Sequence, residues 1–178
     1  MERIKKIVGE RVYLAPLNEA DCEQYVRWLN DFEITDRIGN SDLVISEKSE
    51  EEWLADNIKK GNHIYGIILA ETNQIIGNIG IESIAHTHRR AEVGLFIGDE
   101  KYRNKGYGAE ALRLACKYAF DKLNLHSLYL NVFDFNERAI ACYKKVGFKE
   151  AGRLREAYFV NGKYNDVITM DLLREDLK

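Results

Sequence analysis

The order of secondary-structure patterns in the middle of the chain constrains the fold more than any other feature. Alternating polar and apolar residues predict strands over Arg90–Ile97 and Ser127–Phe133, and apolar residues at helical spacing predict a helix over 109–123 between them. Strands joined through a helix run parallel when they pair in one sheet. The sequence therefore predicts a parallel strand pair at the centre of the fold.

The remaining patterns surround this unit with antiparallel elements. Ser49-x-x-Glu52 is typical of a helix N-terminal capping box, Gly61 of a helix end, and Asn161-Gly162 of a hairpin turn. We therefore expect a mixed α/β fold: a mainly antiparallel sheet with a central parallel strand pair and helices on both faces. The other predicted strands cover 11–16, 63–71, 74–84, 149–158 and 163–173, and the other predicted helices cover 18–30, 49–61 and 135–145.

Length and composition indicate one globular domain. The chain has 178 residues, 46% of them hydrophobic, and Pro16 is its only proline, so we expect a single domain over 1–178. A net charge of −3 argues against a nucleic-acid-binding protein. No apolar run approaches the ~20 residues of a membrane span, and no apolar leader is visible. Because Cys22, Cys116 and Cys142 lack paired spacing, we expect reduced cysteines and a cytoplasmic protein.

The segment 101–111, Lys-Tyr-Arg-Asn-Lys-Gly-Tyr-Gly-Ala-Glu-Ala, is typical of an anion site. Unpaired N–H groups at the start of the predicted helix favour negative charge, and glycines let a phosphate approach the backbone. The spacing Gly106-x-Gly108-x-x-Ala111 also matches the dinucleotide-binding fingerprint, with Asp134 near the place of a ribose-binding acid. We reject that interpretation because mostly polar residues separate the strand from the first glycine and three strands precede it.

Two motifs resemble the GCN5-related N-acetyltransferases, the acetyl-CoA-dependent GNAT superfamily. Residues 103–108 fit the signature (Arg/Gln)-x-x-Gly-x-(Gly/Ala), and 131–148 resembles the second motif of the family. The segment 91–97 adds to the match, which covers 63–173 well. The run 86–92 and the Asn161-Gly162 hairpin resemble the group of ribosomal-protein alanine and spermidine acetyltransferases.

The resemblance implies the GNAT fold and a site for acetyl-CoA, with no metal. The strand over 95–97 would offer backbone groups to the pantetheine arm, the loop would hold the pyrophosphate, and Asn136 would bind the cofactor. The alternative for Asn136 is a first-turn residue behind a capping box formed by Asp134 and Glu137. The residues so predicted to bind the cofactor are Leu95, Phe96, Ile97, Arg103, Asn104, Lys105, Gly106, Tyr107, Gly108, Ala109, Asn131 and Asn136.

Acetyl transfer from a thioester to an amine by direct attack requires a neutral amine and a proton for the departing thiolate. Since an alkylamine has a pKa of about 10.4, a base must take its proton near pH 7. Glu92 is the first candidate and Glu82 the second, the alternative being an ion pair of Glu92 with Arg89 or Arg90. The resemblance implies that Tyr143 protonates the thiolate, the alternative being an ordinary half-buried tyrosine.

An acidic segment is predicted to face the amine. Residues 21–56 hold eleven acidic and three basic side chains, which would concentrate a cation near the acceptor groove. We predict that Asp31, Glu33 and Asp36 bind the substrate from a loop, with Tyr158 and Tyr164 opposite. Glu50–Glu52 are expected to form a solvated helix face.

The acceptor itself stays open among a protein N-terminus, a small amine and a polyamine. Spermidine enzymes of the family carry acids where this chain has Gly80 and Ser83, which weakens the polyamine hypothesis. A non-catalytic acyl-CoA-binding module is a further alternative. His86 and His88 lack neighbouring ligands for a metal, and a homodimer is an expectation from the family only.

Overall fold

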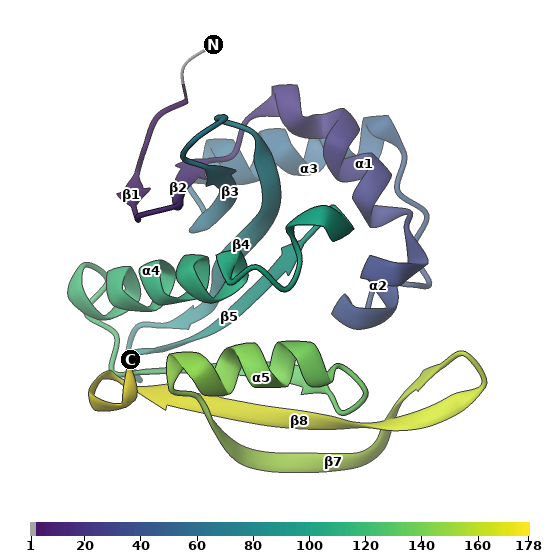
Figure 1. Ribbon diagram of the computed structural model, residues 1–178, viewed down its shortest axis with the longest axis vertical. Coiled ribbons are helices and arrows are strands. Elements are labelled where there is room, and N and C mark those ends of the chain that lie inside the picture. The colour runs from purple at the N-terminus through teal and green to yellow at the C-terminus, as the bar shows by residue number, and fades with distance from the viewer. Residues whose placement is uncertain (1–2) are drawn as a thin grey trace.

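One mixed sheet organises the protein in the computed structural model, which describes residues 3–178 (Figure 1). Its eight strands lie in the order β1-β2-β3-β4-β5-β6-β8-β7. The predicted α/β fold is therefore confirmed. The strands are β1 (Ile7–Val8), β2 (Val12–Pro16), β3 (Ile64–Leu69), β4 (Ile75–Ala85), β5 (Arg90–Ile97), β6 (Ser127–Phe133), β7 (Lys149–Val160) and β8 (Lys163–Leu173).

The predicted parallel pair is present, and it is short. β5 and β6 pair only through Arg90–Glu92 and Ser127–Tyr129, and both strands then continue without pairing to each other. All other neighbouring strands pair antiparallel. The sheet is thus split between β5 and β6 beyond Glu92.

Helices cover both faces of this sheet, as expected. The residues of β2 alternate between two cores: Val12 and Leu14 pack with the residues of α4 and α5, whereas Tyr13 and Ala15 pack with those of α1 and α3. No helix within residues 3–178 is long and apolar enough to cross a membrane. The helices are α1 (Cys22–Leu29), α2 (Phe32–Ile38), α3 (Glu47–Lys60), α4 (Tyr107–Asp121) and α5 (Glu137–Val146), with three short 3-10 turns at Glu19–Asp21, Glu100–Tyr102 and Arg174–Asp176.

Two local predictions at the N-terminal half were wrong. Helix α3 begins at Glu47, so Ser46 is its N-cap and Ser49 closes the capping box from the third position. The segment predicted as a loop holds helix α2, which begins after Asp31 and ends at Gly39. Only Ile34 and Thr35 of this short, polar helix are buried. An apolar repeat that would predict the helix is therefore not clear in its sequence, and tertiary packing stabilises it.

The C-terminal hairpin confirms the Asn161-Gly162 turn. β7 and β8 form a long ribbon whose tip projects beyond the helices, and β7 is the outer strand of the sheet (Figure 1). Both turn residues have positive φ, 51° for Asn161 and 75° for Gly162.

Candidate active site

Two cavities flank the split between β5 and β6. The α4 cavity, of about 320 Å³, is lined by β5, α4 and α5, and the α3 cavity, of about 620 Å³, is lined by β4, β5 and the helices of the other face. The two cavities adjoin at the split, where they share six lining residues: Arg37, Ile38, Leu95, Phe96, Asn131 and Tyr143. Two molecules bound in these cavities would therefore lie next to each other at the split.

The start of helix α4 supplies backbone donors to the α4 cavity. Gly106 is the N-cap, with a left-handed φ of 84°, and as a glycine it gives the first turn no side-chain capping hydrogen bond. Tyr107, Gly108 and Ala109 follow directly and line the cavity. Uncapped N–H groups at a helix N-terminus form an anion site, so this edge fits a phosphate.

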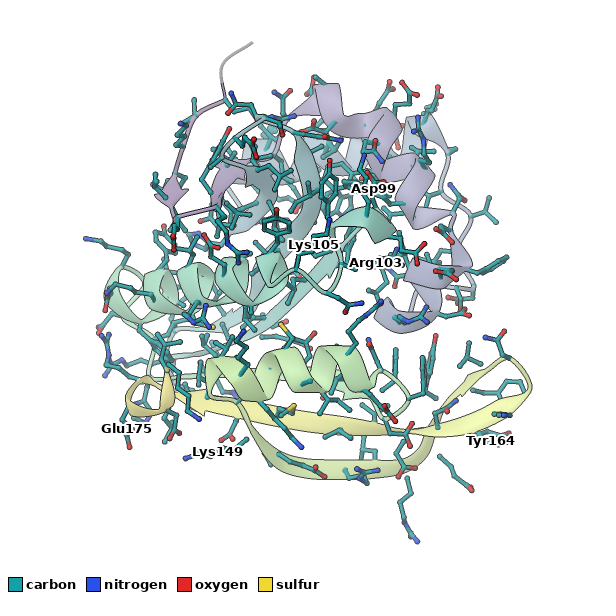
Figure 2. All side chains as sticks on the ribbon, viewed as in Figure 1. Asp99, Arg103, Lys105, Lys149, Tyr164 and Glu175 are labelled. Carbon is teal, nitrogen blue, oxygen red and sulfur yellow. The ribbon has the colours of Figure 1, made fainter. Side chains whose placement is uncertain are left out.

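Three guanidinium groups line the same cavity: Arg37 of α2, Arg103 of the loop before α4 and Arg138 of α5. Arg103 donates hydrogen bonds to the carbonyls of Ile97 (3.2 Å) and Gly98 (2.5 Å), and pairs with Glu33 of α2 at 3.4 Å (Figure 2). Burial, with Arg103 and Arg37 nearby, lowers the pKa of Arg138. Such convergence of cations favours an anionic ligand. Sequence reasoning missed Arg37 and Arg138 because their side chains approach the cavity only in the folded chain.

The structure brings eleven of the twelve predicted cofactor-binding residues to the α4 cavity. Lys105 is the exception: it is not among the lining residues, and its carbonyl accepts a hydrogen bond from Arg11 at 2.9 Å (Figure 2). Asn136 lines the cavity and is itself the N-cap of α5, its side chain accepting from the N–H of Ala139 at 3.3 Å. The capping box of Asp134 and Glu137 was therefore the wrong alternative.

Three carboxylates line the α3 cavity: Glu50 of α3, Glu82 of β4 and Glu92 of β5. The side chain of Glu50 is buried, with 4% of the residue exposed, and its Oε1 has no hydrogen-bond partner within residues 3–178. Burial raises the pKa of Glu50. The expectation of a solvated face was thus wrong for Glu50, whereas Glu51 and Glu52 are exposed.

Glu82 and Glu92 face each other as register partners on β4 and β5. Partial removal from water raises the pKa of Glu82, and the neighbouring Glu92 carboxylate raises it further. The predicted alternative for Glu92 was wrong: Arg89 binds Asn124, Arg90 lies over the ring of Tyr129, and no ion pair joins either to Glu92 in the described chain. Glu92 instead accepts a hydrogen bond from Asn131 Nδ2 at 3.2 Å.

Tyr143 lies where the cavities meet. It belongs to helix α5, lines both cavities and leaves 8% of its surface exposed. Burial raises the pKa of Tyr143 well above its ordinary value, so the phenol keeps its proton at neutral pH. Tyr143 is therefore as buried as an ordinary core tyrosine, and it differs from one in lying at the split between β5 and β6.

The residues predicted to bind the substrate do not gather in the α3 cavity. Glu33 lines the α4 cavity, Asp31 caps α2, and Asp36 binds Asn161 of the hairpin at 2.8 Å. These positions differ from the prediction because Phe32–Ile38 forms a helix, capped by Asp31, rather than a loop along the groove. Tyr158 stacks on Phe133, a lining residue of the α3 cavity, with ring centres 3.7 Å apart, whereas Tyr164 is exposed near the hairpin tip (Figure 2).

Comparisons with known proteins agree with this geometry. A family model for the acetyltransferase (GNAT) domain matches residues 11–149. The chain belongs to the GNAT acetyltransferases. The family prediction is confirmed.

Particular relatives include the groups expected from the motifs. A spermidine N(1)-acetyltransferase of Escherichia coli (strain K12) is 44% identical over 94 residues, which cover 53% of this GNAT chain and 50% of the relative. A putative ribosomal N-acetyltransferase of Bacillus subtilis (strain 168) is 30% identical over 102 residues, or 57% and 55% of the two chains. The chain thus spans about half the length of these curated relatives.

The fold is also that of solved GNAT structures. Spermidine N-acetyltransferase from Vibrio cholerae, in complex with CoA and spermine, superposes with a TM-score of 0.85 and is 28% identical, the match covering 94% of this chain and 98% of that one. The GNAT family uses acetyl-CoA, and this neighbour binds CoA. No group of three or more His, Cys, Asp or Glu that could hold a metal occurs in the part of the chain described, 3–178.

Proposed function

We propose that this protein is an acetyl-CoA-dependent N-acetyltransferase in which a primary amine attacks the thioester directly. The observation that carries the proposal is the junction of the two cavities at the split sheet, with Tyr143 and Asn131 lining both. A donor on one face and an acceptor on the other can react there without leaving the protein.

The α4 cavity fits the donor. The uncapped amides of α4 and the guanidinium groups of Arg37 and Arg138 suit the pyrophosphate. Within residues 3–178, the edge of β5 that faces β6 has no strand partner beyond Glu92, so its backbone can pair with the amide groups of the pantetheine arm. Acetyl-CoA bound this way supplies an activated acyl group next to the split.

The α3 cavity suits a cationic acceptor. Three carboxylates in one cavity concentrate an ammonium ion. Glu92 then accepts the proton of the amine as its nitrogen attacks the acyl carbon, with Glu82 opposite as the second candidate.

Tyr143 supplies the proton for the leaving thiolate. Its raised pKa keeps the phenol protonated until the carbon–sulfur bond breaks, and the proton then passes to the sulfur. The buried position of Tyr143 also keeps competing water away.

Spermidine or another polyamine is the specific candidate among the acceptors that the sequence left open. The buried carboxylate of Glu50 lies in the same cavity as Glu82 and Glu92, so a second ammonium group of the substrate has a counter-charge there. The 44% identity to a spermidine acetyltransferase supports this choice. A protein N-terminus remains the alternative, and a cytoplasmic location and a homodimer remain predictions.

The direct test measures CoA release from acetyl-CoA with a panel of polyamines, peptides with free N-termini and aminosugars. We expect turnover with at least one primary amine, and a loss of about 100-fold or more in Glu92→Gln because a general base is removed. Glu51→Gln, an exposed change of the same chemistry, is the control and should keep full turnover.

The same panel separates the alternatives. Binding of acetyl-CoA, seen as a rise in melting temperature, without turnover of any amine would indicate the non-catalytic binding module. Stabilisation by NADH and not by acetyl-CoA would overturn the proposal altogether.

A further inference from the structure

A row of three polar side chains crosses β5, β6 and β8 where β5 and β6 separate. Asn131 Nδ2 donates to Glu92 Oε1 at 3.2 Å, and Thr169 Oγ1 donates to Asn131 Oδ1 at 2.8 Å. Asn131 and Thr169 are register partners on β6 and β8. The chain neighbours of all three residues are buried core residues, so the three side chains project from the same face of the sheet.

Glu92 sets the direction of these hydrogen bonds because its carboxylate only accepts, and Thr169 anchors the other side of the Asn131 amide. An asparagine amide has an accepting oxygen on one side and a donating nitrogen on the other. When the threonine hydroxyl donates to Oδ1, the amide nitrogen must face Glu92. A flipped amide would bring Oδ1 of Asn131 against the Glu92 carboxylate, where two acceptors repel each other. Thr169 therefore anchors Asn131, through Oδ1, in the orientation in which its Nδ2 holds Glu92.

We propose that Thr169 is a positioning residue that acts through Asn131 to hold the Glu92 carboxylate ready for the amine proton. The inference rests on the proposed role of Glu92 as the base. In that step the proton of the attacking nitrogen moves to Glu92, while Thr169 and Asn131 give up no proton. Thr169 is absent from the lining of both cavities, so its influence on the reaction passes through Asn131.

The first test compares Thr169→Val with Thr169→Ser. Valine keeps the shape and strand propensity of threonine and removes the hydroxyl, so kcat should fall about fivefold, the range of one neutral hydrogen bond, with KM for acetyl-CoA unchanged. Serine restores the hydroxyl and should restore kcat to within about twofold of the original protein, as expected if the hydrogen bond is kept. Thr169→Ala provides a second hydroxyl-free variant if valine lowers the yield of folded protein.

A double-mutant cycle separates positioning from a general structural effect. In a Glu92→Gln background, Thr169→Val should lower kcat no further, because the group that it positions is already gone. An equal loss in both backgrounds would overturn the inference, and so would full kcat in Thr169→Val when Glu92→Gln is slow. Full kcat in Glu92→Gln would instead show that Glu92 is not the general base. That result would contradict the proposed function and is distinguishable from a failure of the inference about Thr169.

Discussion

At the scale of single residues, burial decides what the polar side chains near the split can do. Tyr143 is surrounded by core residues of α5 and the sheet and still borders both cavities. A phenol in that environment remains neutral, and it can give its proton only to a group that becomes strongly basic beside it. The departing thiolate becomes such a group because the burial that raises the pKa of the phenol also raises that of a thiol formed beside it.

The corresponding prediction concerns Tyr143→Phe. Removing the hydroxyl should lower kcat by about 100-fold or more, the usual effect of losing a general acid, with KM for acetyl-CoA within about twofold. Steady-state kinetics with a saturating amine measures both constants. Tyr118→Phe removes a hydroxyl from a partly buried tyrosine outside both cavities and should leave kcat unchanged. Equal kcat values for Tyr143→Phe and the original protein would show that Tyr143 is not the general acid.

Glu50 gives a prediction about stability and pH. Burial raises its pKa in the folded state, so between about pH 4.3 and that raised value the folded protein binds more protons than the unfolded chain. The free energy of unfolding therefore falls as pH rises through this window, and Glu50→Gln should not show that fall. We expect Glu50→Gln to be more stable at pH 8 by about 1 kcal/mol, with the gain shrinking toward pH 4.

Urea unfolding at several pH values measures this difference. Glu51→Gln, on the exposed side of the same helix, should track the original protein at every pH. A constant difference between Glu50→Gln and the original protein across the range would contradict a buried, titrating carboxylate.

At the scale of elements, the start of helix α4 combines a backbone requirement with the proposed site for the pyrophosphate. Gly106 has a φ of 84°, and a Cβ there would lie 3.1 Å from the Arg11 guanidinium. Gly162 in the hairpin has a similar φ of 75° and open space around it. The two glycines therefore form a matched pair, one beside the α4 cavity and one far from it.

We predict that Gly106→Ala and Gly162→Ala each lower the free energy of unfolding by about 1 kcal/mol, because alanine is strained at positive φ. Only Gly106→Ala should also reduce the rise in melting temperature caused by acetyl-CoA, since it displaces the first-turn amides. Thermal unfolding with and without acetyl-CoA measures both effects. An undiminished rise in Gly106→Ala would show that these amides do not hold the ligand.

The same elements explain what could be predicted from the sequence. The parallel unit, α4 and the Asn161-Gly162 hairpin depend on residues close together in the chain, so local patterns indicate them. The carboxylates of the α3 cavity do not depend on local sequence. Glu50 comes from α3 and shares a cavity with Glu82 and Glu92 only after the sheet and helices pack. The short helix α2 carries no strong apolar repeat of helical spacing, and its sequence therefore predicts a loop along the groove.

At the scale of the whole molecule, the two cavities open on opposite faces of one sheet. Each substrate can enter without passing the other, and no side chain between them needs to carry the acetyl group. We therefore predict sequential kinetics, with initial-rate lines that intersect when both substrates are varied. Parallel lines, together with an acetylated protein trapped in the absence of amine, would indicate a covalent route instead.

The short contact between β5 and β6 has a consequence for the folded state itself. Three residue pairs join the strands, and beyond them the peptide groups of β5 and β6 do not pair with each other, which leaves a gap in the ladder. Under the proposed function, a thioester cosubstrate bound in this gap pairs with the backbone of β5 where β6 does not. The cosubstrate then stabilises the folded sheet as well as taking part in the reaction. The amide protons of residues 93–97 should therefore exchange with solvent more slowly when it is bound.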